Sequence, residues 1–206
     1  MKWLKKMFER IYTPKTLMEA ARRARLPHEK MQVSKRQTRY TYTDGPMMFL
    51  GQQIVKSMED AGFPAKIHCC YRSPEQQMDV YGRGNSRAKA WESPHQYMEA
   101  VDIVHPSLFW NVSADYWEQL AVSTRIVSEK FGVDLTGGLD WGWDLAHIEI
   151  RDWRSLKDDP DWLDFKREEL RSVQEGQPAP EVPRDALQRR FQEVLPSVWA
   201  QYLRRK

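Results

Sequence analysis

The sequence is poor in cysteine and lacks a long apolar run. Its only two cysteines, Cys69 and Cys70, are adjacent, and neighbouring residues of a strand point to opposite faces, which argues against a disulfide between them. We therefore expect both thiols to be reduced, as in proteins made in a cytosol. No segment approaches the ~20 apolar residues of a membrane-spanning helix. Residues 1–15 have a basic start but no continuous apolar stretch, so we expect no secretory signal and synthesis in the cytoplasm.

The chain also lacks a strong excess of either charge. It has 32 Lys and Arg against 29 Asp and Glu, a net charge of +3, and this balance gives no argument for a nucleic-acid partner. Hydrophobic residues make up 41% and charged residues 30%, which is typical of a globular protein. The 206 residues suffice for one substantial core with some chain left over.

The apolar spacing predicts a mixture of helices and strands without regular strand–helix–strand alternation. Helices are expected at residues 46–60, 73–84 and 116–131, and strands at 65–72, 100–106 and 146–153, with a Gly- and Trp-rich loop at 136–144. We therefore expect an α+β fold. A small central antiparallel sheet is flanked by helices, with helical extensions at both termini.

Three regions are expected along the chain. Residues 1–44 form a helical arm and a polar loop, residues 45–153 form the main domain, and residues 154–206 form a C-terminal helical extension with a Pro-rich linker at 175–183. The apolar stripe of residues 3–11 carries basic neighbours, and docking on the protein itself is favoured over contact with an anionic membrane.

The final helix is predicted from residue 184 to about 204, kinked by Pro196. It has one apolar stripe, formed by Leu187, Phe191, Val194, Val198 and Tyr202. Three interpretations remain open: docking on the main domain, which is favoured, a dimerisation seam, or a basic amphipathic helix on an anionic surface.

Three segments carry residues suited to hydrolytic metal chemistry: CCYRSPEQQ with Arg72, SPHQYMEAVDIV with His95 and Asp102, and WGWDLAHIEI with Asp144 and His147. A hydrolytic zinc site needs three protein ligands and an open position. It also needs an unbound carboxylate near the attacking water. We predict His95, Asp102 and His147 as zinc ligands, Asp144 as the general base and Arg72 as the oxyanion-stabilising cation.

Neighbouring residues are candidates for support. Glu149 lies two residues after His147 in a predicted strand, so it should face the same side and support that ligand. Trp141 and Trp143 either wall a substrate cleft or pack in the core.

These segments resemble the zinc D-Ala-D-Ala carboxypeptidase family, which includes VanX- and VanY-type enzymes and phage L-alanyl-D-glutamate endopeptidases. The resemblance rests on Y-R-S at residues 71–73, S-x-H-x-x-x-x-A-x-D at 93–102 and D-x-x-H at 144–147, and it covers roughly residues 45–153. It implies one zinc ion, the ligand and base roles given above, and a Ser93 that orients the substrate or His95. The pattern G-G-x-D-W-x-x-D-x-x-H is closer to the phage endolysin branch.

One position departs from the family pattern. The family usually has glycine three residues after the first ligand, where this chain has Met98. Glycine supports tight backbone geometry, so we expect an altered hairpin between His95 and Asp102, with more effect on substrate fit than on metal binding.

The resemblance implies a zinc peptidase that cuts the peptide part of bacterial peptidoglycan. A phage or prophage endolysin is favoured, released from the cytoplasm to act in the cell wall, and an L-alanyl-D-glutamate endopeptidase is favoured over a D-Ala-D-Ala carboxypeptidase. Two alternatives are a zinc-containing binding module without hydrolysis, as in the Hedgehog signalling domain, and a virion- or envelope-associated protein.

Overall fold

The computed structural model describes residues 45–177 and 180–203. The predicted arm of residues 1–44 lies outside the described residues. In chain order the elements are α3 (Pro46–Asp60), β1 (Lys66–Cys69), α4 (Pro74–Gly82), η2 (Pro94–Tyr97), β2 (Ala100–Val104), α5 (Ala114–Phe131), β3 (Leu135–Gly137), α6 (Gly138–Trp141), β4 (His147–Ile150), η3 (Trp153–Asp158), α7 (Pro160–Gln174), α8 (Arg184–Val194) and α9 (Pro196–Leu203). None of the described helices is long and apolar enough to cross a membrane.

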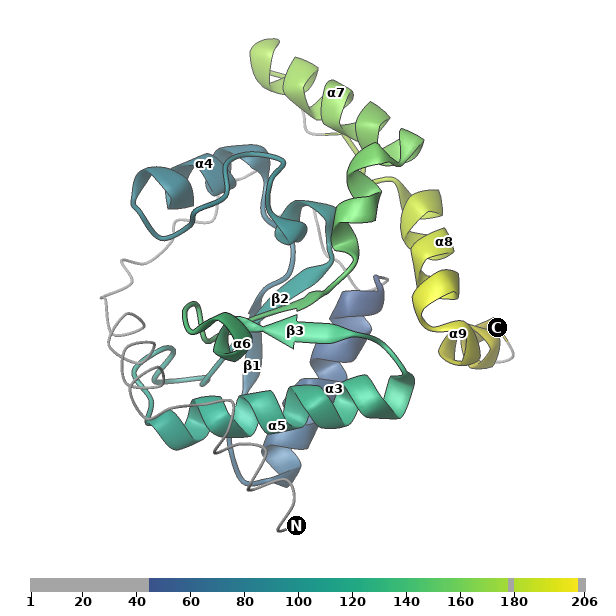
Figure 1. Cartoon of the computed structure of the whole chain (residues 1–206). Helices are drawn as coiled ribbons and strands as arrows, with labels where there is room; N and C mark the ends of the chain where they lie inside the picture. Colours follow the sequence, from purple (N-terminus) through teal and green to yellow (C-terminus); the bar gives the residue numbers. More distant parts are fainter. Residues whose placement is uncertain (1–44, 178–179, 204–206) are drawn as a thin grey trace.

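The centre of the fold is a four-stranded antiparallel sheet in the order β1-β2-β4-β3. Helices α3 and α5 lie against one face of this sheet (Figure 1). The expected α+β fold with a small antiparallel sheet is therefore confirmed. The sequence does not predict β3 and α6, which occupy most of the expected Gly- and Trp-rich loop, because a three-residue strand and a four-residue helix are too short to show periodicity.

The two faces of the sheet differ in chemistry because side chains alternate along a strand. Val101 and Ile103 of β2 and Ile148 of β4 are buried in the main apolar core with α3 and α5. Between them, Asp102 and His147 point to the other face, and they are directly paired across β2 and β4. This pairing places two polar side chains side by side on a rigid sheet.

A second apolar cluster joins the C-terminal helices to the segment around η2. It includes Tyr97 of η2 and the following Met98, Trp153 of η3, Trp162 of α7 and Leu187 of α8. Met98, which stands where the family usually has glycine, adopts the left-handed conformation with φ +60° while its side chain is fully buried. Burial of the methionine side chain offsets the strain of that conformation, about 1–2 kcal/mol.

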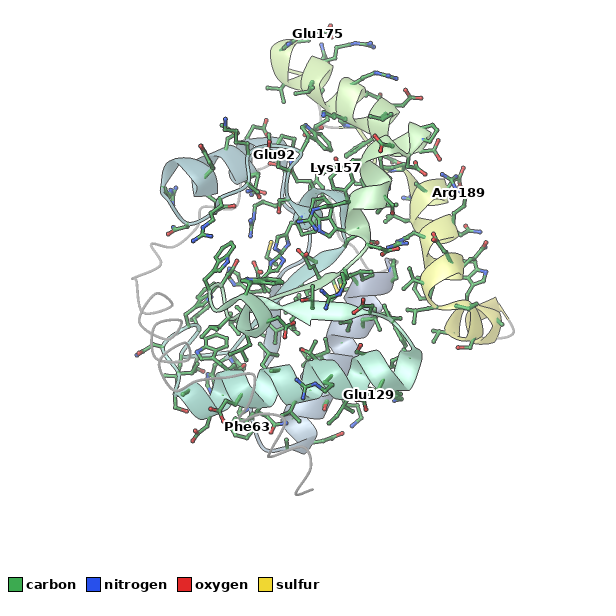
Figure 2. The ribbon with its side chains drawn as sticks, in the orientation of Figure 1. Phe63, Glu92, Glu129, Lys157, Glu175 and Arg189 are labelled. Atoms are coloured by element: carbon green, nitrogen blue, oxygen red, sulfur yellow. The ribbon has the colours of Figure 1, made fainter. Side chains whose placement is uncertain are left out.

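The described side chains of the C-terminal stripe pack on the protein, as the favoured interpretation predicted, and the side chain of Tyr202 lies outside the described residues. Leu187 is buried in the second cluster and Phe191 in the main core, while Val194 and Val198 are partly buried against the main core. The single kinked helix predicted here is wrong, because Leu195 leaves the helical conformation and separates α8 from α9 at Pro196. Arg189, labelled on α8 in Figure 2, forms ion pairs with Asp159 and Asp161 at the start of α7.

Candidate metal centre and active site

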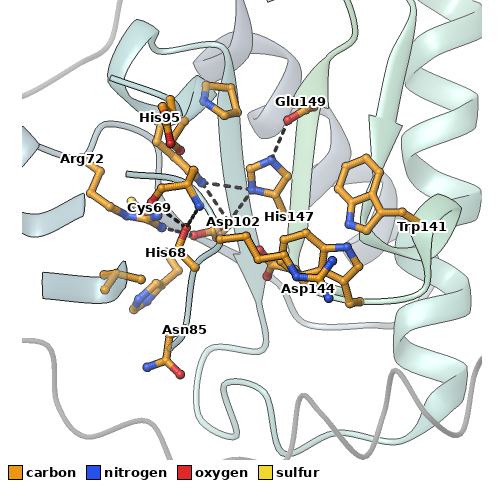
Figure 3. A pocket seen from close by; sticks show the side chains of 18 of the residues that line it. His68, Cys69, Arg72, Asn85, His95, Asp102, Trp141, Asp144, His147 and Glu149 are labelled. Atoms are coloured by element: carbon orange, nitrogen blue, oxygen red, sulfur yellow. Dashed lines mark hydrogen bonds and ion pairs between the residues drawn. The ribbon is translucent and has the colours of Figure 1, made fainter. Parts of the chain in front are cut away.

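The polar face of the sheet opens into a cavity of about 440 Å³. Its floor carries residues of β1, β2 and β4, and its walls come from the loop between α4 and η2 and from the segment around α6 (Figure 3). All nine site residues predicted from the sequence line this cavity: Arg72, Ser93, His95, Asp102, Trp141, Trp143, Asp144, His147 and Glu149.

Three electron-pair donors converge at the floor of the cavity. His95 Nε2 lies 3.1 Å from His147 Nδ1 and 3.2 Å from Asp102 Oδ1. His147 Nδ1 and Asp102 Oδ1 are 3.3 Å apart. Ligand atoms placed tetrahedrally around zinc, at the usual bond lengths, are about 3.3 Å from one another. The three atoms therefore have the mutual spacing of a tetrahedral site before any ion is considered.

The outer hydrogen bonds of the two histidines orient these donors inward. His95 Nδ1 donates to the Cys70 carbonyl oxygen at 2.9 Å, which leaves Nε2 to face the site. His147 Nε2 donates to Glu149 Oε2 at 3.1 Å, which leaves Nδ1 to face it. Glu149 is itself held by Trp153 Nε1, which donates to Oε1 at 3.2 Å. Such outer partners fix the tautomer and ring orientation of metal-binding histidines.

The electrostatics of the cluster favour a cation among the three donors. Burial lowers the pKa of His95. Burial opposes the charge on Asp102, but both histidines and Arg72 outweigh it and hold the pKa of Asp102 well below its usual range. Burial also lowers the pKa of His147, yet Asp102 and Glu149 outweigh it and raise that pKa to about 10. A site that would hold a proton so firmly also suits a divalent cation, which must displace that proton.

Cys69 is a fourth donor at the edge of this cluster, and it was not predicted from the sequence. Its Sγ and ligand atoms of His95 and Asp102 all lie within 4.8 Å of one another. The thiol donates to the Tyr71 carbonyl oxygen at 3.3 Å, and burial raises its pKa to about 11, so it remains protonated. Cys69 is the cross-strand partner of Asp102 only because the strand register shifts between Ile67 and Cys69, and such a shift cannot be predicted from spacing.

Arg72 brings a positive charge to the same cluster. Its Nη2 lies 3.2 Å from Asp102 Oδ2, and its Nη1 donates to Gln77 Oε1 at 3.0 Å. Its backbone N–H donates to the His95 carbonyl oxygen at 3.3 Å. The guanidinium is thus fixed beside a predicted metal ligand, where a developing negative charge would meet it.

Asp144 lies in the turn before β4 with a φ of +54°. This turn needs Gly138, because a Cβ at that position would lie 1.8 Å from the Asp144 carbonyl oxygen. The residue is exposed toward the cavity, although the surrounding protein partly desolvates its carboxylate. This desolvation and the nearby Asp102 charge raise the pKa of Asp144 to about 6, which suits a base that works near neutral pH.

The remaining predicted residues surround this centre. Ser93 is buried beside His95 at the start of η2. The Trp141 ring lies 5.9 Å from the His147 ring and 6.4 Å from the Trp143 ring, measured between centroids. Both tryptophans are half-buried and border the cavity.

Comparison with protein-family models and with curated proteins gives no match. Among solved structures, the chain is similar to the crystal structure of Serratia marcescens L-Ala D-Glu endopeptidase ChiX. The two share 22% sequence identity with a TM-score of 0.45, over 55% of this chain and 85% of that one. A similarity at this level assigns no activity to the chain.

Proposed function

We propose that the chain is a zinc-dependent peptidase that hydrolyses an amide bond in the peptide part of bacterial peptidoglycan. The observation that carries this proposal is the convergence of His95 Nε2, Asp102 Oδ1 and His147 Nδ1 within 3.1–3.3 Å of one another, in a cavity that also holds Asp144 and Arg72. Two imidazoles and one carboxylate are a donor set that suits zinc.

His95, Asp102 and His147 would hold the ion. Zinc, when bound, would act as a Lewis acid that polarises the scissile carbonyl and makes water nucleophilic at neutral pH. Asp144 would accept a proton from the attacking water and return it to the leaving amine. The Arg72 guanidinium would stabilise the negative charge that develops on the carbonyl oxygen.

The supporting residues have narrower roles. Glu149 would keep His147 in the tautomer whose Nδ1 faces the site, and Ser93 would orient His95 or the substrate. Trp141 and Trp143 would wall the substrate cleft. The motif resemblance supports peptidoglycan as the substrate, L-alanyl-D-glutamate cleavage over D-Ala-D-Ala cleavage, and a phage or prophage endolysin that reaches the cell wall after synthesis in the cytoplasm.

Digestion of defined muropeptides with mass analysis of the products tests the proposal. We expect cleavage between L-alanine and D-glutamate, loss of cleavage when a chelator removes the metal, and recovery when zinc is restored. Release of free D-alanine instead would make the chain a carboxypeptidase. Intact muropeptides in the presence of bound zinc would contradict hydrolysis and favour a non-catalytic binding module.

A further inference from the structure

Arg87 lines the cavity and has no role in the chemistry described above. It belongs to the loop between α4 and η2, and it lines the cavity together with Trp143 and Asp144. Its guanidinium carbon lies over the Trp143 ring, 4.7 Å from the ring centroid. Because Trp143 precedes Asp144, Arg87 is stacked next to the residue proposed as the base.

Among the described residues, Arg87 is a positive charge of the cavity without an ion-pair partner, as is Arg154, whose guanidinium lies over the Trp153 ring. Arg72 pairs with Asp102, and Arg83 pairs with Asp79 at 2.8 Å. Arg87 forms no ion pair with any carboxylate in the described part of the chain, and it is exposed. Stacking on tryptophan covers one face of the guanidinium, while the N–H groups at its edge stay free to form the paired hydrogen bonds that fit a carboxylate.

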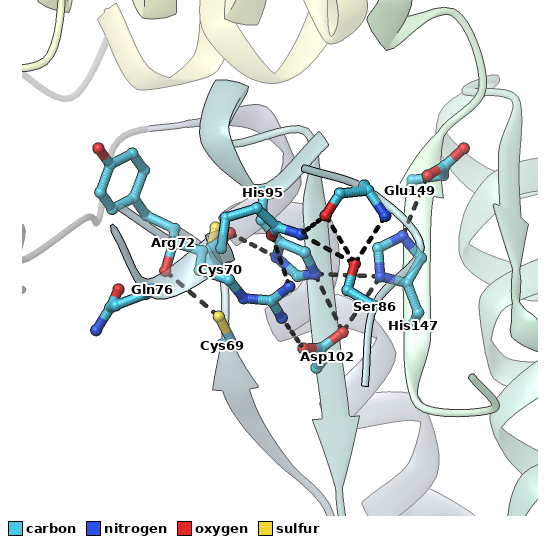
Figure 4. A network of polar contacts seen from close by, with 12 residues as sticks. Cys69, Cys70, Arg72, Gln76, Ser86, His95, Asp102, His147 and Glu149 are labelled. Atoms are coloured by element: carbon cyan, nitrogen blue, oxygen red, sulfur yellow. Dashed lines mark hydrogen bonds and ion pairs between the residues drawn. The ribbon is translucent and has the colours of Figure 1, made fainter. Parts of the chain in front are cut away.

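The loop that carries Arg87 is tied to the catalytic centre through Gln77. This residue is fully buried. Its side-chain amide accepts a hydrogen bond from Arg72, and it donates to Ser86 Oγ at 2.9 Å and to the Ala88 carbonyl oxygen at 2.6 Å. Arg72, Ser86 and Asp102 are seen in this network in Figure 4. The residues on both sides of Arg87 are therefore held in place, which a substrate-orienting charge requires.

We propose that Arg87 binds a carboxylate of the substrate and selects acidic peptides whose free carboxylate lies near the scissile bond. This inference rests on the proposed peptidase function and names the feature of the peptide that the cavity recognises. The carboxylate has two sources in a short peptide, an α-carboxylate within a γ-linked glutamyl residue or the terminal carboxylate, and both offer the same two oxygens to Arg87.

Peptide binding to the full chain in its zinc-loaded form tests the proposal. Asp144→Asn serves as the background, so that no peptide is consumed during calorimetry. Four synthetic peptides are compared: one with both carboxylates free, one with only the glutamyl carboxylate amidated, one with only the terminal carboxylate amidated, and one with both amidated. We expect amidation of one carboxylate to weaken binding by about tenfold to a hundredfold, the usual range for a hydrogen bond to a charged group.

Adding Arg87→Gln should abolish the difference between the free and amidated peptides and leave the affinity for the doubly amidated peptide unchanged. Arg83→Gln is the matched control, because it removes the same charge from the same cavity at a residue that already has a partner, and it should preserve the difference. The position whose amidation matters identifies the source of the carboxylate. Equal affinity for all four peptides, or a difference that survives Arg87→Gln, would overturn the proposal.

The failure of the peptidase function would look different. Cleavage of the same peptides is measured with Asp144 intact, and selective binding without cleavage would leave the role of Arg87 standing while contradicting hydrolysis. Cleavage without selective binding would leave the peptidase function standing while contradicting the role of Arg87.

Discussion

Single residues of the candidate site differ in how far the sequence predicts them. His95, Asp102 and His147 were predictable because their types and spacing suit a metal, and strand alternation also placed Glu149 on the same face. The sequence does not predict the roles of the Cys70 carbonyl, Gln77 and Trp153, since their contacts depend on tertiary packing between segments far apart in the chain. The proximity of Cys69 to the cluster could not be predicted either, because a register shift makes it the cross-strand partner of Asp102.

His147 and Cys69 are the two candidates for the third metal ligand beside His95 and Asp102, and their variants separate the two. We expect His147→Ala to lose zinc, because it removes a donor whose outer hydrogen bond to Glu149 directs Nδ1 inward. Cys69→Ser should keep about one zinc per chain, because the protonated thiol is engaged by the Tyr71 carbonyl. Metal analysis of the two purified variants checks this, with circular dichroism as the control for folding. The opposite pattern would make Cys69 the ligand.

The pH dependence of cleavage should report the charge state of Asp144. Its pKa is raised to about 6 in the absence of a metal, and a base must be deprotonated to act, so activity is lost as pH falls through the pKa. A bound cation lowers this pKa, so we expect kcat/KM to decline only at or below about pH 6. Rates on a defined muropeptide between pH 4 and 8 measure this decline. A decline centred well above pH 7 would contradict Asp144 as the base.

Among the elements, the segment from η2 to β2, which joins His95 to Asp102, is anchored by α8. Glu99 accepts two hydrogen bonds from Arg190, from Nε at 3.1 Å and from Nη2 at 2.9 Å. The side chains of this pair are 0% and 3% exposed. The Glu99 carbonyl also accepts from the Ile150 N–H of β4 at 3.0 Å. The C-terminal extension thereby fixes a segment that carries two predicted metal ligands.

Breaking this buried pair should destabilise the protein. We expect Arg190→Met to lower the free energy of unfolding by about 3–5 kcal/mol, because it leaves the Glu99 carboxylate buried without its partner. The double variant Glu99→Gln with Arg190→Met should recover part of the loss. Arg189→Met is the matched control: Arg189 lies at the surface with its ion pairs, and its loss should have a much smaller effect than the loss of Arg190. Urea unfolding measures all three, and equal effects at the two arginines would refute the anchoring role.

At the scale of the whole molecule, the sequence predicted the fold class and the order of the main elements. It divided the chain at residue 153 because the composition changes there. The division into separate regions at residue 153 stays a prediction. In the structure the two regions pack together through the second apolar cluster, in which Trp162 and Leu187 contact Tyr97 and Met98. Contacts of this kind could not be predicted from the sequence because the partners lie far apart in it. Apolar spacing alone does not identify the surface that a helix covers.

Removal of α8 and α9 should therefore weaken the whole protein. A chain truncated after residue 183 loses the buried side chains of Leu187, Phe191 and Leu195 and leaves Glu99 without Arg190. We expect the Tm to fall by about 10–20 °C from the loss of apolar burial alone. Thermal unfolding followed by circular dichroism measures the change. An unchanged Tm with full peptidoglycan hydrolysis would mean that the extension serves only targeting or assembly.

The most direct test of the account is to assay purified peptidoglycan with the wild type and with Asp144→Ala, while the zinc bound to each is quantified. We predict about one zinc per chain in both proteins and release of peptide fragments by the wild type alone. Zinc in both proteins with no fragments from either would contradict the peptidase function. Absence of zinc from both would contradict the assignment of His95, Asp102 and His147 as metal ligands.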